Sequence, residues 1–175
     1  YALKKLGAKI KIKNGYIFAS ANKGLKGTKF KFPSISVGAT ENAILAAVQA
    51  KGPTIIDNCA VEPEIKDLIN FLKKLGVNIK VKNRKITIKN SIVEKKISHE
   101  VISDRIELGT YLIGGALTAK KLKLKNANSN LIRKEINILK KMGIKMNIKK
   151  NYIEVFKSKN IKNINIKTEP YPGFP

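Results

Sequence analysis

Ser36-Val37-Gly38-Ala39-Thr40 is the segment of this sequence best suited to hold a negatively charged ligand. It stands at the expected start of a helix, where the first backbone N–H groups have no partner inside the helix. Such N–H groups, beside a glycine that lacks a Cβ, bind an anion without any basic side chain. The residues at 36–38 are therefore compatible with an anion site, although the pattern alone does not choose between this interpretation and the next. The alternative is that Gly38 only permits tight packing where the helix begins.

Five charged residues are further candidates for a binding site. Glu62 and Glu64 lie at the expected start of a second helix, where negative charge also stabilises the positive end of the helix dipole. Asp104, Arg105 and Glu107 lie together at the start of a third helix. They could form an ion-pair network that positions the wall of a cleft, or they could simply cap the helix. The residues alone leave both alternatives open.

Cys59 and His99 each occur once in the sequence, and neither is expected to do chemistry. A single cysteine allows no internal disulfide, and we expect Cys59 to be a small buried hydrophobic residue rather than a reactive thiol. His99 stands alone in a polar stretch and is expected on the surface without a role. The sequence contains no cluster of metal ligands and no Ser/His/Asp arrangement. Metal chemistry and triad catalysis are therefore not predicted.

A phrase that occurs three times reveals the repeated unit that positions these residues. It reads Leu-Lys-Lys-Leu-Gly at 3–7 and 72–76, and Leu-Lys-Lys-Met-Gly at 139–143. Its final glycines are 69 and then 67 residues apart. A near-constant period indicates a tandem array of one structural unit. We expect only the end of the first copy to be present.

Each copy of the phrase lies where a helix ends and a strand begins. Residues 65–72 carry apolar side chains at i, i+3, i+4 and i+7, which is one face of a helix, and 132–139 show a similar face. After the glycine the apolar period changes to two, which is typical of a half-buried hairpin. Hairpins of this kind are expected at 10–18, 79–89 and 144–155.

A second helix and a strand precede each amphipathic helix. Residues 38–47 and 109–117 are apolar nearly all round and are expected to be buried helices, which lead to strands at 54–58 and 122–126. With a strand before each apolar helix, the unit is β-α-β-α-β-β. A unit of roughly 65 residues buries too small a share of its surface to be stable alone. We therefore expect an α/β fold (α+β in some schemes) in which units share their apolar helices in a common interior.

The formal charge of +24 at first suggests nucleic-acid binding. Of the 36 basic residues, however, only Arg84, Arg105 and Arg133 are arginines, whose forked side chain is the usual partner of phosphate oxygens. The lysines are spread evenly among many isoleucines and asparagines. We interpret the charge as composition bias on solvated strand faces, with selection for polyanion binding as the alternative. No apolar run reaches the about 18 residues of a membrane span.

Four stretches together resemble the UDP-N-acetylglucosamine enolpyruvyl transferase family in type, order and spacing. They are Ser36-Val37-Gly38-Ala39-Thr40, Glu62-Pro63-Glu64-Ile65, Asp104-Arg105-Ile106-Glu107 with Gly109-Thr110, and Pro170-Tyr171-Pro172-Gly173-Phe174-Pro175. The resemblance implies transfer of the enolpyruvyl group of phosphoenolpyruvate to the 3′-hydroxyl of UDP-N-acetylglucosamine, with release of phosphate. That reaction is the first committed step of peptidoglycan synthesis. It also implies a cytoplasmic monomer that uses no metal or organic cofactor, spans no membrane and binds no specific nucleic acid.

The family's fold is an inside-out α/β barrel with two domains of three units each and an active site in the cleft between them. The resemblance implies that this chain is an internal fragment, with residues 1–103 from the end of the first domain and 104–175 from the start of the second. The family's catalytic cysteine lies on a loop before residue 1, so no catalytic residue is expected here and Cys59 does not take that role. Substrate contacts are implied at Ser34, Ile35, Ser36, Val37 and Gly38. Cleft positions are implied at Glu62, Glu64, Asp104, Arg105 and Glu107.

Two other functions remain as alternatives at this point. The related enzyme 5-enolpyruvylshikimate-3-phosphate synthase shares the fold and the enolpyruvyl chemistry, although the Ser-Val-Gly-Ala-Thr and Asp-Arg-Ile-Glu phrases favour the amino-sugar enzyme. A basic nucleic-acid-binding module built on the same repeat is the alternative of a different class. It is disfavoured because the sequence shows no aromatic pair on a strand, no glycine-rich clamp loop and no arginine cluster.

Overall fold

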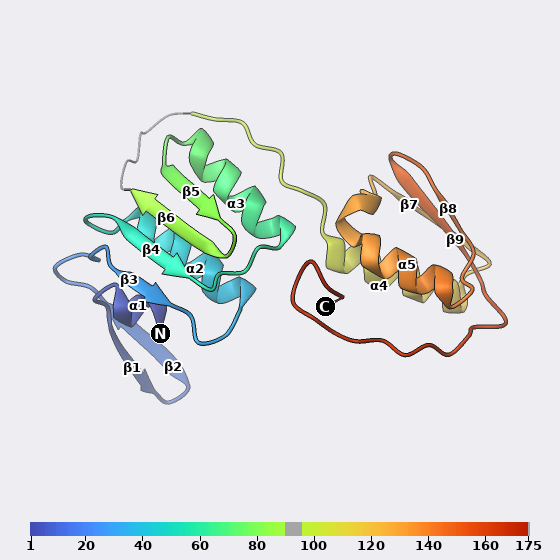
Figure 1. Ribbon diagram of the computed structural model, residues 1–175, viewed down its shortest axis with the longest axis horizontal. Coiled ribbons are helices and arrows are strands. Elements are labelled where there is room, and N and C mark those ends of the chain that lie inside the picture. Colours follow the sequence, from blue (N-terminus) through green and yellow to red (C-terminus); the bar gives the residue numbers. More distant parts are fainter. Residues whose placement is uncertain (90–95, 175) are drawn as a thin grey trace. The chain divides into compact units, whose positions relative to one another are not determined.

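The computed structural model describes residues 1–89 and 96–174, which fall into two compact units. Unit 1 comprises Tyr1–Glu100 and unit 2 comprises Val101–Pro175. In each unit, helices cover one face of an antiparallel or mixed sheet (Figure 1). The domain boundary expected after residue 103 concerns the domains of a longer enzyme and stays a prediction.

Unit 1 opens with a short helix and a separate hairpin. Helix α1 (Ala2–Lys5) is followed by β1 (Lys9–Lys13) and β2 (Tyr16–Ser20), which pair antiparallel as a two-stranded sheet. Ile12 lies opposite Ile17, and both side chains are largely exposed. The first expected hairpin is confirmed, but in unit 1 it has no buried face.

The rest of unit 1 is one complete copy of the predicted unit. Its elements in chain order are β3 (Lys29–Lys31), α2 (Val37–Val48), β4 (Thr54–Asp57), α3 (Pro63–Lys74), β5 (Asn78–Lys82) and β6 (Lys85–Lys89). The sheet has the order β3-β4-β6-β5, with β3 and β4 parallel and the other pairs antiparallel. The predicted order β-α-β-α-β-β is therefore confirmed.

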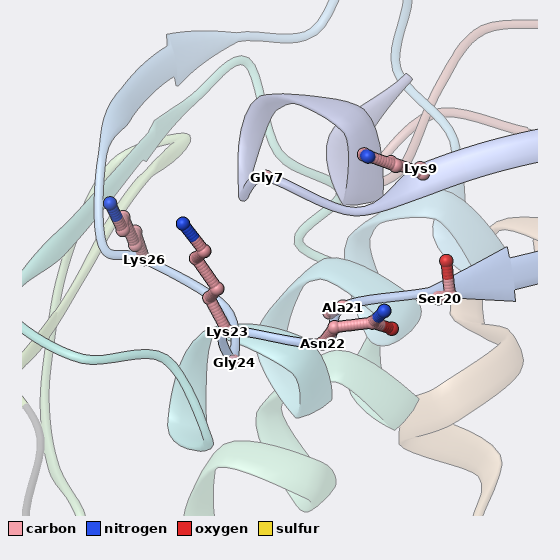
Figure 2. A pocket seen from close by; sticks show the side chains of 8 residues that line it. All are labelled: Gly7, Lys9, Ser20, Ala21, Asn22, Lys23, Gly24 and Lys26. Atoms are coloured by element: carbon pink, nitrogen blue, oxygen red, sulfur yellow. The ribbon is translucent and has the colours of Figure 1, made fainter.

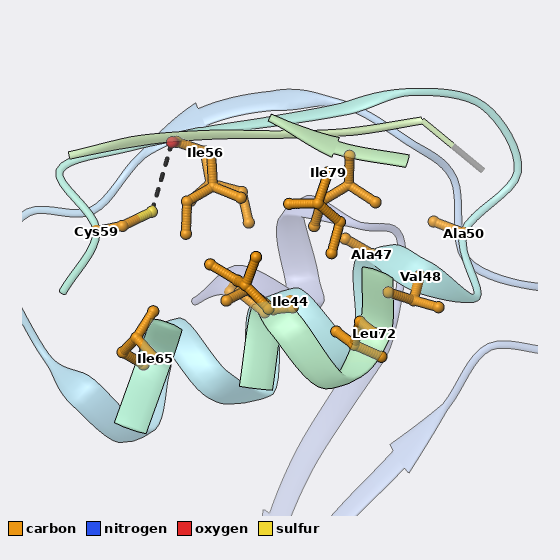
Figure 3. Close-up of a cluster of buried hydrophobic side chains, with 14 of the residues drawn as sticks. Ile44, Ala47, Val48, Ala50, Ile56, Cys59, Ile65, Leu72 and Ile79 are labelled. Carbon is orange, nitrogen blue, oxygen red and sulfur yellow. Dashed lines mark hydrogen bonds between the residues drawn. The ribbon is translucent and has the colours of Figure 1, made fainter. Parts of the chain in front are cut away.

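The core of unit 1 lies between this sheet and the two helices beneath it (Figure 3). Ile44 of α2 is fully buried, together with Ile56 of β4. Ile65 and Leu72 of α3 face the same core, as the apolar face expected in that helix requires. Ile79 of β5 is buried as well, whereas the lysines that alternate with the apolar residues along β5 and β6 are exposed.

Unit 2 repeats part of this arrangement. Its elements are α4 (Arg105–Thr118), β7 (Lys121–Lys125), the 3-10 helix η1 (Ser129–Ile132), α5 (Arg133–Lys141), β8 (Met146–Ile148) and β9 (Tyr152–Phe156). The strands form an antiparallel sheet in the order β7-β9-β8. Residues 96–104 form no strand, and 90–95 lie outside the described residues, so a first strand before α4 is not established. Gly115 lets α4 approach the sheet, because a Cβ there would lie 2.7 Å from Val155.

Within its own unit, each apolar helix is buried on one side only, and the shared interior expected between units stays a prediction. In α2, Leu45 is 50% exposed, and α4 has a wider exposed face. Ile106, Ile113 and Leu117 are each about half exposed, at 57%, 48% and 53%. Leu112 and Ala116, on the face toward the sheet, are fully buried. Within unit 2 the sheet covers only one side of the helix, so an all-round apolar pattern leaves the other side in solvent.

The three repeated phrases all end their helices in the same way. Gly7, Gly76 and Gly143 adopt left-handed backbone conformations, with φ of 94°, 92° and 87°. In each copy the glycine N–H donates to the carbonyl three residues earlier, and the next N–H donates to the carbonyl five residues earlier. This pair of bonds is the Schellman motif, which glycine forms without steric cost. The prediction that each phrase joins a helix to a strand is confirmed.

His99 is not the unpartnered surface residue that the sequence predicts. Its side chain is only 10% exposed, and its Nε2 lies 3.1 Å from Oδ1 of Asp67. Its ring also contacts Phe71 edge-on, with 5.4 Å between centroids. His99 therefore anchors residues 96–100 to α3. Among the described residues, no helix combines the length and the apolar character needed to cross a membrane.

Candidate functional site

The start of α2 has the free donors that an anion site needs. Ser36 caps the helix in an extended conformation, with φ −148° and ψ 127°, and its Oγ accepts the Ala39 N–H at 3.3 Å. Among the described residues, no acceptor bonds to the N–H groups of Val37 and Gly38. These two donors lie at the positive end of a 12-residue helix, where an anion is stabilised.

Gly38 lies in open space rather than at a tight contact. A Cβ added to Gly38 would meet no atom within 4 Å among the described residues. Its carbonyl accepts a hydrogen bond from Nδ2 of Asn42 at 2.8 Å. The structure of unit 1 thus gives the tight-packing alternative for Gly38 no support.

The segment before α2 alternates between solvent and core. Ser34, Ser36 and Gly38 are exposed, whereas Ile35 and Val37 are half-buried and pack against the core of unit 1. The two apolar side chains hold the segment down, while the small residues between them leave its backbone open. All five predicted contact residues therefore lie on one continuous stretch of surface at the start of α2.

Thr40 ties this stretch to the loop before α3, a contact that sequence reasoning missed. Its hydroxyl is fully buried, donates to the Ser36 carbonyl at 2.7 Å and accepts the Ala60 N–H at 3.0 Å. Asn58 adds a second tie, since its Nδ2 donates to the Phe32 carbonyl at 3.0 Å. A hydroxyl one turn into an apolar helix was the signal in the sequence that could have found Thr40.

Glu62 and Glu64 lie at the other end of that loop. Glu62 is only 6% exposed, and its Oε2 accepts the Val61 N–H at 2.7 Å rather than an N–H of α3. Glu64 lies in the first turn of α3, as the helix-dipole interpretation requires. Through Ala60 and Thr40, the loop that carries Glu62 is bonded to the start of α2.

Cys59 lies in the same loop but is not a nucleophile. Its side chain is fully buried, and its Sγ donates to the Ile56 carbonyl at 3.4 Å. Burial raises the pKa of the thiol to about 12. The thiolate that nucleophilic chemistry needs is therefore not formed near neutral pH. The expectation that Cys59 is a small buried residue is confirmed.

In unit 2, Asp104 caps α4. Its Oδ1 accepts the N–H groups of Ile106 at 2.8 Å and Glu107 at 3.0 Å. Asp104 and Glu107 also line a hollow of 600 Å³ beside β7, together with Tyr111, Lys123 and Lys125 among others. For Asp104 the structure thus supports the capping alternative, and it adds a concave surface beside the cap.

Arg105 is directed to a different part of unit 2. It is only 8% exposed, and its guanidinium lies 5.9 Å from the centroid of the Tyr171 ring. Tyr171 belongs to the turn at 170–174, which is closed by bonds from the Gly173 N–H to the Pro170 carbonyl and from the Glu169 N–H to the Phe174 carbonyl. Two of the stretches that carry the family resemblance therefore meet in unit 2.

The part of the chain that the structure describes contains no group of three or more His, Cys, Asp or Glu residues arranged to hold a metal ion. The donors available at the start of α2 are backbone N–H groups, and those lining the hollow beside α4 include two lysines and a tyrosine. Such donors are suited to bind phosphate and hydroxyl groups by hydrogen bonding and charge.

Comparison with known proteins gives a consistent result. The family model described as EPSP synthase (3-phosphoshikimate 1-carboxyvinyltransferase) matches residues 1–175. The chain is 56% identical to the UDP-N-acetylglucosamine 1-carboxyvinyltransferase of Pelagibacter ubique (strain HTCC1062) and 48% identical to that of Endomicrobium trichonymphae, over 99% of its own length. It spans only 42% of the length of either relative.

Two solved structures share the fold. The enolpyruvyl transferase NikO from Streptomyces tendae matches 99% of this chain with a TM-score of 0.82 and 17% identity, and the match covers 44% of NikO. An EPSP synthase from Acinetobacter baumannii matches 95% of this chain with a TM-score of 0.63 and 22% identity, and the match covers 40% of that protein. The expected fold class, α/β of the enolpyruvyl transferase type, is confirmed.

Proposed function

The chain belongs to the EPSP synthase (3-phosphoshikimate 1-carboxyvinyltransferase) family, and we propose that it contributes to an enzyme that acts on UDP-N-acetylglucosamine. The enzyme transfers the enolpyruvyl group of phosphoenolpyruvate to the 3′-hydroxyl of the sugar and releases phosphate. Relatives at 56% and 48% identity carry the name of that transferase and support the choice of acceptor. Peptidoglycan synthesis and a cytoplasmic location follow from this proposal.

One observation carries the proposal: two adjacent backbone N–H groups without acceptors at the start of α2. UDP-N-acetylglucosamine carries a diphosphate, whose oxygens can accept both donors of Val37 and Gly38 and interact favourably with the helix dipole. The absence of a side chain on Gly38 lets the ligand approach the backbone. Ser34, Ile35 and Ser36 continue this contact surface toward the rest of the nucleotide.

The other candidates take supporting parts in this proposal. Thr40 holds the α2 start against the loop that carries Glu62, and so fixes the direction of its N–H groups. Glu64 is proposed to lie near the cleft beside Glu62. We assign no catalytic residue to this chain, because its one thiol is buried and protonated.

Residues 1–103 are proposed to belong to one enolpyruvyl transferase domain and 104–175 to the next. In the second domain, Asp104, Arg105 and Glu107 are proposed to shape the cleft wall. The hollow beside Asp104 and Glu107 supports this part of the proposal, as does the cation–π contact between Arg105 and Tyr171. The half-exposed face of α4 is where we expect the remaining helices of that domain to pack.

The related acceptor shikimate 3-phosphate is a second candidate, because the matching family model is named for the enzyme that uses it. Phosphate release from phosphoenolpyruvate, measured on the complete protein with each acceptor in turn, distinguishes the two. We expect turnover with UDP-N-acetylglucosamine and none with shikimate 3-phosphate. Turnover with shikimate 3-phosphate alone would overturn the proposal.

A further inference from the structure

A small cavity in unit 1 is lined by three lysines and by no acidic residue. The cavity has a volume of 430 Å³ and lies between the turn after α1 and the loop that follows β2 (Figure 2). Its lining residues are Gly7, Lys9, Ser20, Ala21, Asn22, Lys23, Gly24 and Lys26. Figure 2 shows that Lys9 comes from the strand on one side of the cavity, while Lys23 and Lys26 rise from the loop on the other.

Backbone hydrogen bonds hold the loop of this cavity in shape. The Gly24 N–H donates to the Ala21 carbonyl at 2.7 Å, and Gly24 adopts a left-handed φ of 74°, so the loop closes in a tight turn. The Lys26 N–H donates to the Leu6 carbonyl at 2.9 Å and joins the loop to the turn after α1. The Lys51 N–H donates to the Leu25 carbonyl at 2.8 Å and ties the loop to the rest of unit 1.

The positive charge in this cavity is not neutralised by the protein. Among the described residues, no carboxylate lies within 4.0 Å of the ammonium group of Lys9, Lys23 or Lys26. Elsewhere, lysines of the sheets do form such pairs, for example Lys121 with Glu154 at 2.9 Å. The sequence of residues 1–40 contains nine lysines and neither aspartate nor glutamate.

We propose that this cavity binds a small phosphorylated molecule with two or more negative charges. Three ammonium groups, the Ser20 hydroxyl and the Asn22 amide give it several donors for phosphate oxygens. Its volume of 430 Å³ matches a small ligand, and its three lysines are exposed and therefore accessible to one. The cavity shares no lining residue with the anion site proposed at the start of α2.

The test is a calorimetric titration of the full chain with inorganic pyrophosphate at physiological ionic strength. The variant K23Q/K26Q removes two of the three lysines of the cavity, and K11Q/K13Q removes two exposed lysines of β1 that do not line it. Both variants lose the same charge, so bulk attraction weakens equally in both. We expect the pyrophosphate Kd to rise about tenfold or more in K23Q/K26Q, because charge-assisted hydrogen bonds are lost, and to change less than about twofold in K11Q/K13Q.

Amide chemical shifts recorded during the same titration give an independent readout. We expect changes confined to residues 7–9 and 20–26, with unchanged spectra elsewhere showing that both variants remain folded. Equal weakening in the two variants, or shifts spread over all lysine-rich strands, would overturn the proposal. Binding of a single-stranded oligonucleotide more tightly than pyrophosphate, with equal losses in both variants, would instead indicate a general polyanion surface and would also overturn it.

Discussion

The apolar helices of the two units, α2 and α4, begin in different ways. Ser36 caps α2 with one long hydrogen bond of 3.3 Å and leaves the N–H groups of Val37 and Gly38 without acceptors among the described residues. Asp104 caps α4 with a carboxylate oxygen that accepts two N–H groups, at 2.8 and 3.0 Å. The same element of the repeat thus starts with unused donors in unit 1 and with an internal anion in unit 2.

In the proposed function, this difference is the reason that one repeated unit serves two purposes. A carboxylate at the cap both occupies the donors and repels an incoming anion, so the start of α4 is unsuited to a diphosphate. A serine at the cap carries no charge and leaves the helix dipole available. The repeat supplies the helix in both units, and the capping residue determines whether its start can bind an anion.

The largest predicted effect is a loss of stability caused by Thr40→Val. This substitution removes a contact that α2 has and α4 lacks. The residue four positions after the cap is the buried Thr40 in α2 and the buried Leu108 in α4. Valine cannot accept the Ala60 N–H, which would be left buried and unpaired, so we expect unit 1 to lose about 2–3 kcal/mol of stability. Hydrogen exchange of the amides of unit 1 measures this loss.

The control for Thr40→Val is Thr110→Val in α4. The Thr110 hydroxyl also donates to a carbonyl four residues earlier, that of Ile106 at 2.8 Å, but Thr110 is exposed and water can replace the bond. We expect this variant to change stability by less than about 0.5 kcal/mol. Equal losses in the two variants would show that Thr40 stabilises α2 only as a local side chain and not as a tie to the loop.

The next effect is on ligand binding. Gly38→Asp places a carboxylate beside the unused donors, two positions after the cap residue, so that the start of α2 carries a negative charge as the start of α4 does. We expect binding of UDP-N-acetylglucosamine by the complete protein to weaken by about 1–3 kcal/mol, from lost N–H contacts and charge repulsion. Gln49→Asp, with the same charge change at the other end of α2, should leave the affinity nearly unchanged. Calorimetry that gives the same affinity for wild type and Gly38→Asp would remove the assignment of this site.

Removing each cap residue should cause a smaller loss of stability, and the loss should differ between the two helices. Asp104→Ala removes two short charge-assisted bonds and is expected to destabilise unit 2 by about 1–2 kcal/mol, whereas Ser36→Ala removes one long bond and should cost unit 1 about 0.5 kcal/mol. Hydrogen exchange in the first turns of the two helices measures both losses. A larger loss for Ser36→Ala than for Asp104→Ala would contradict the comparison of the caps.

The local parts of this comparison were predictable from the sequence. The left-handed glycines at the helix ends and the hairpins depend on residues a few positions apart, so composition and spacing sufficed. The start of α4 was less well predicted, because the apolar pattern begins at Gly109 while the helix begins at Arg105. The contacts that fix the site depend on distant residues: Thr40 reaches Ala60, and His99 reaches Asp67 across 32 positions. No local pattern records such a pairing, which is why His99 was expected on the surface.

The number of lysines was known from the sequence, but their positions relative to one another in the fold were not. The sequence counts every lysine, yet the gathering of Lys9, Lys23 and Lys26 around one cavity depends on how the loop after β2 folds back to the turn after α1. The burial of α2 and α4 is incomplete within their own units for a related reason. An apolar pattern tells which residues avoid water, but not whether the partner that covers them lies within the same unit.

The smallest loss of stability is expected from Cys59→Ala, at a position where the two units are most alike. Asn58-Cys59 in unit 1 corresponds to Asn126-Ala127 in unit 2, and both asparagines adopt a left-handed conformation, with φ of 60° and 54°. Cys59 and Ala127 are both buried, so Cys59→Ala reproduces the arrangement of unit 2 and should cost less than about 1 kcal/mol near pH 7.

The pH dependence of the stability difference between wild type and Cys59→Ala gives a further test, because its direction is predicted. Because burial raises the pKa of Cys59 from 9.0 to about 12, the native state keeps the thiol protonated where the unfolded state releases the proton. The resulting stabilisation is fully present below pH 9 and is lost as the pH rises toward about 12. Urea unfolding of both proteins over this range should therefore show the wild type losing stability relative to Cys59→Ala. A constant difference would mean that the thiol titrates normally and is accessible to solvent in the folded chain, contrary to its place in the core of unit 1.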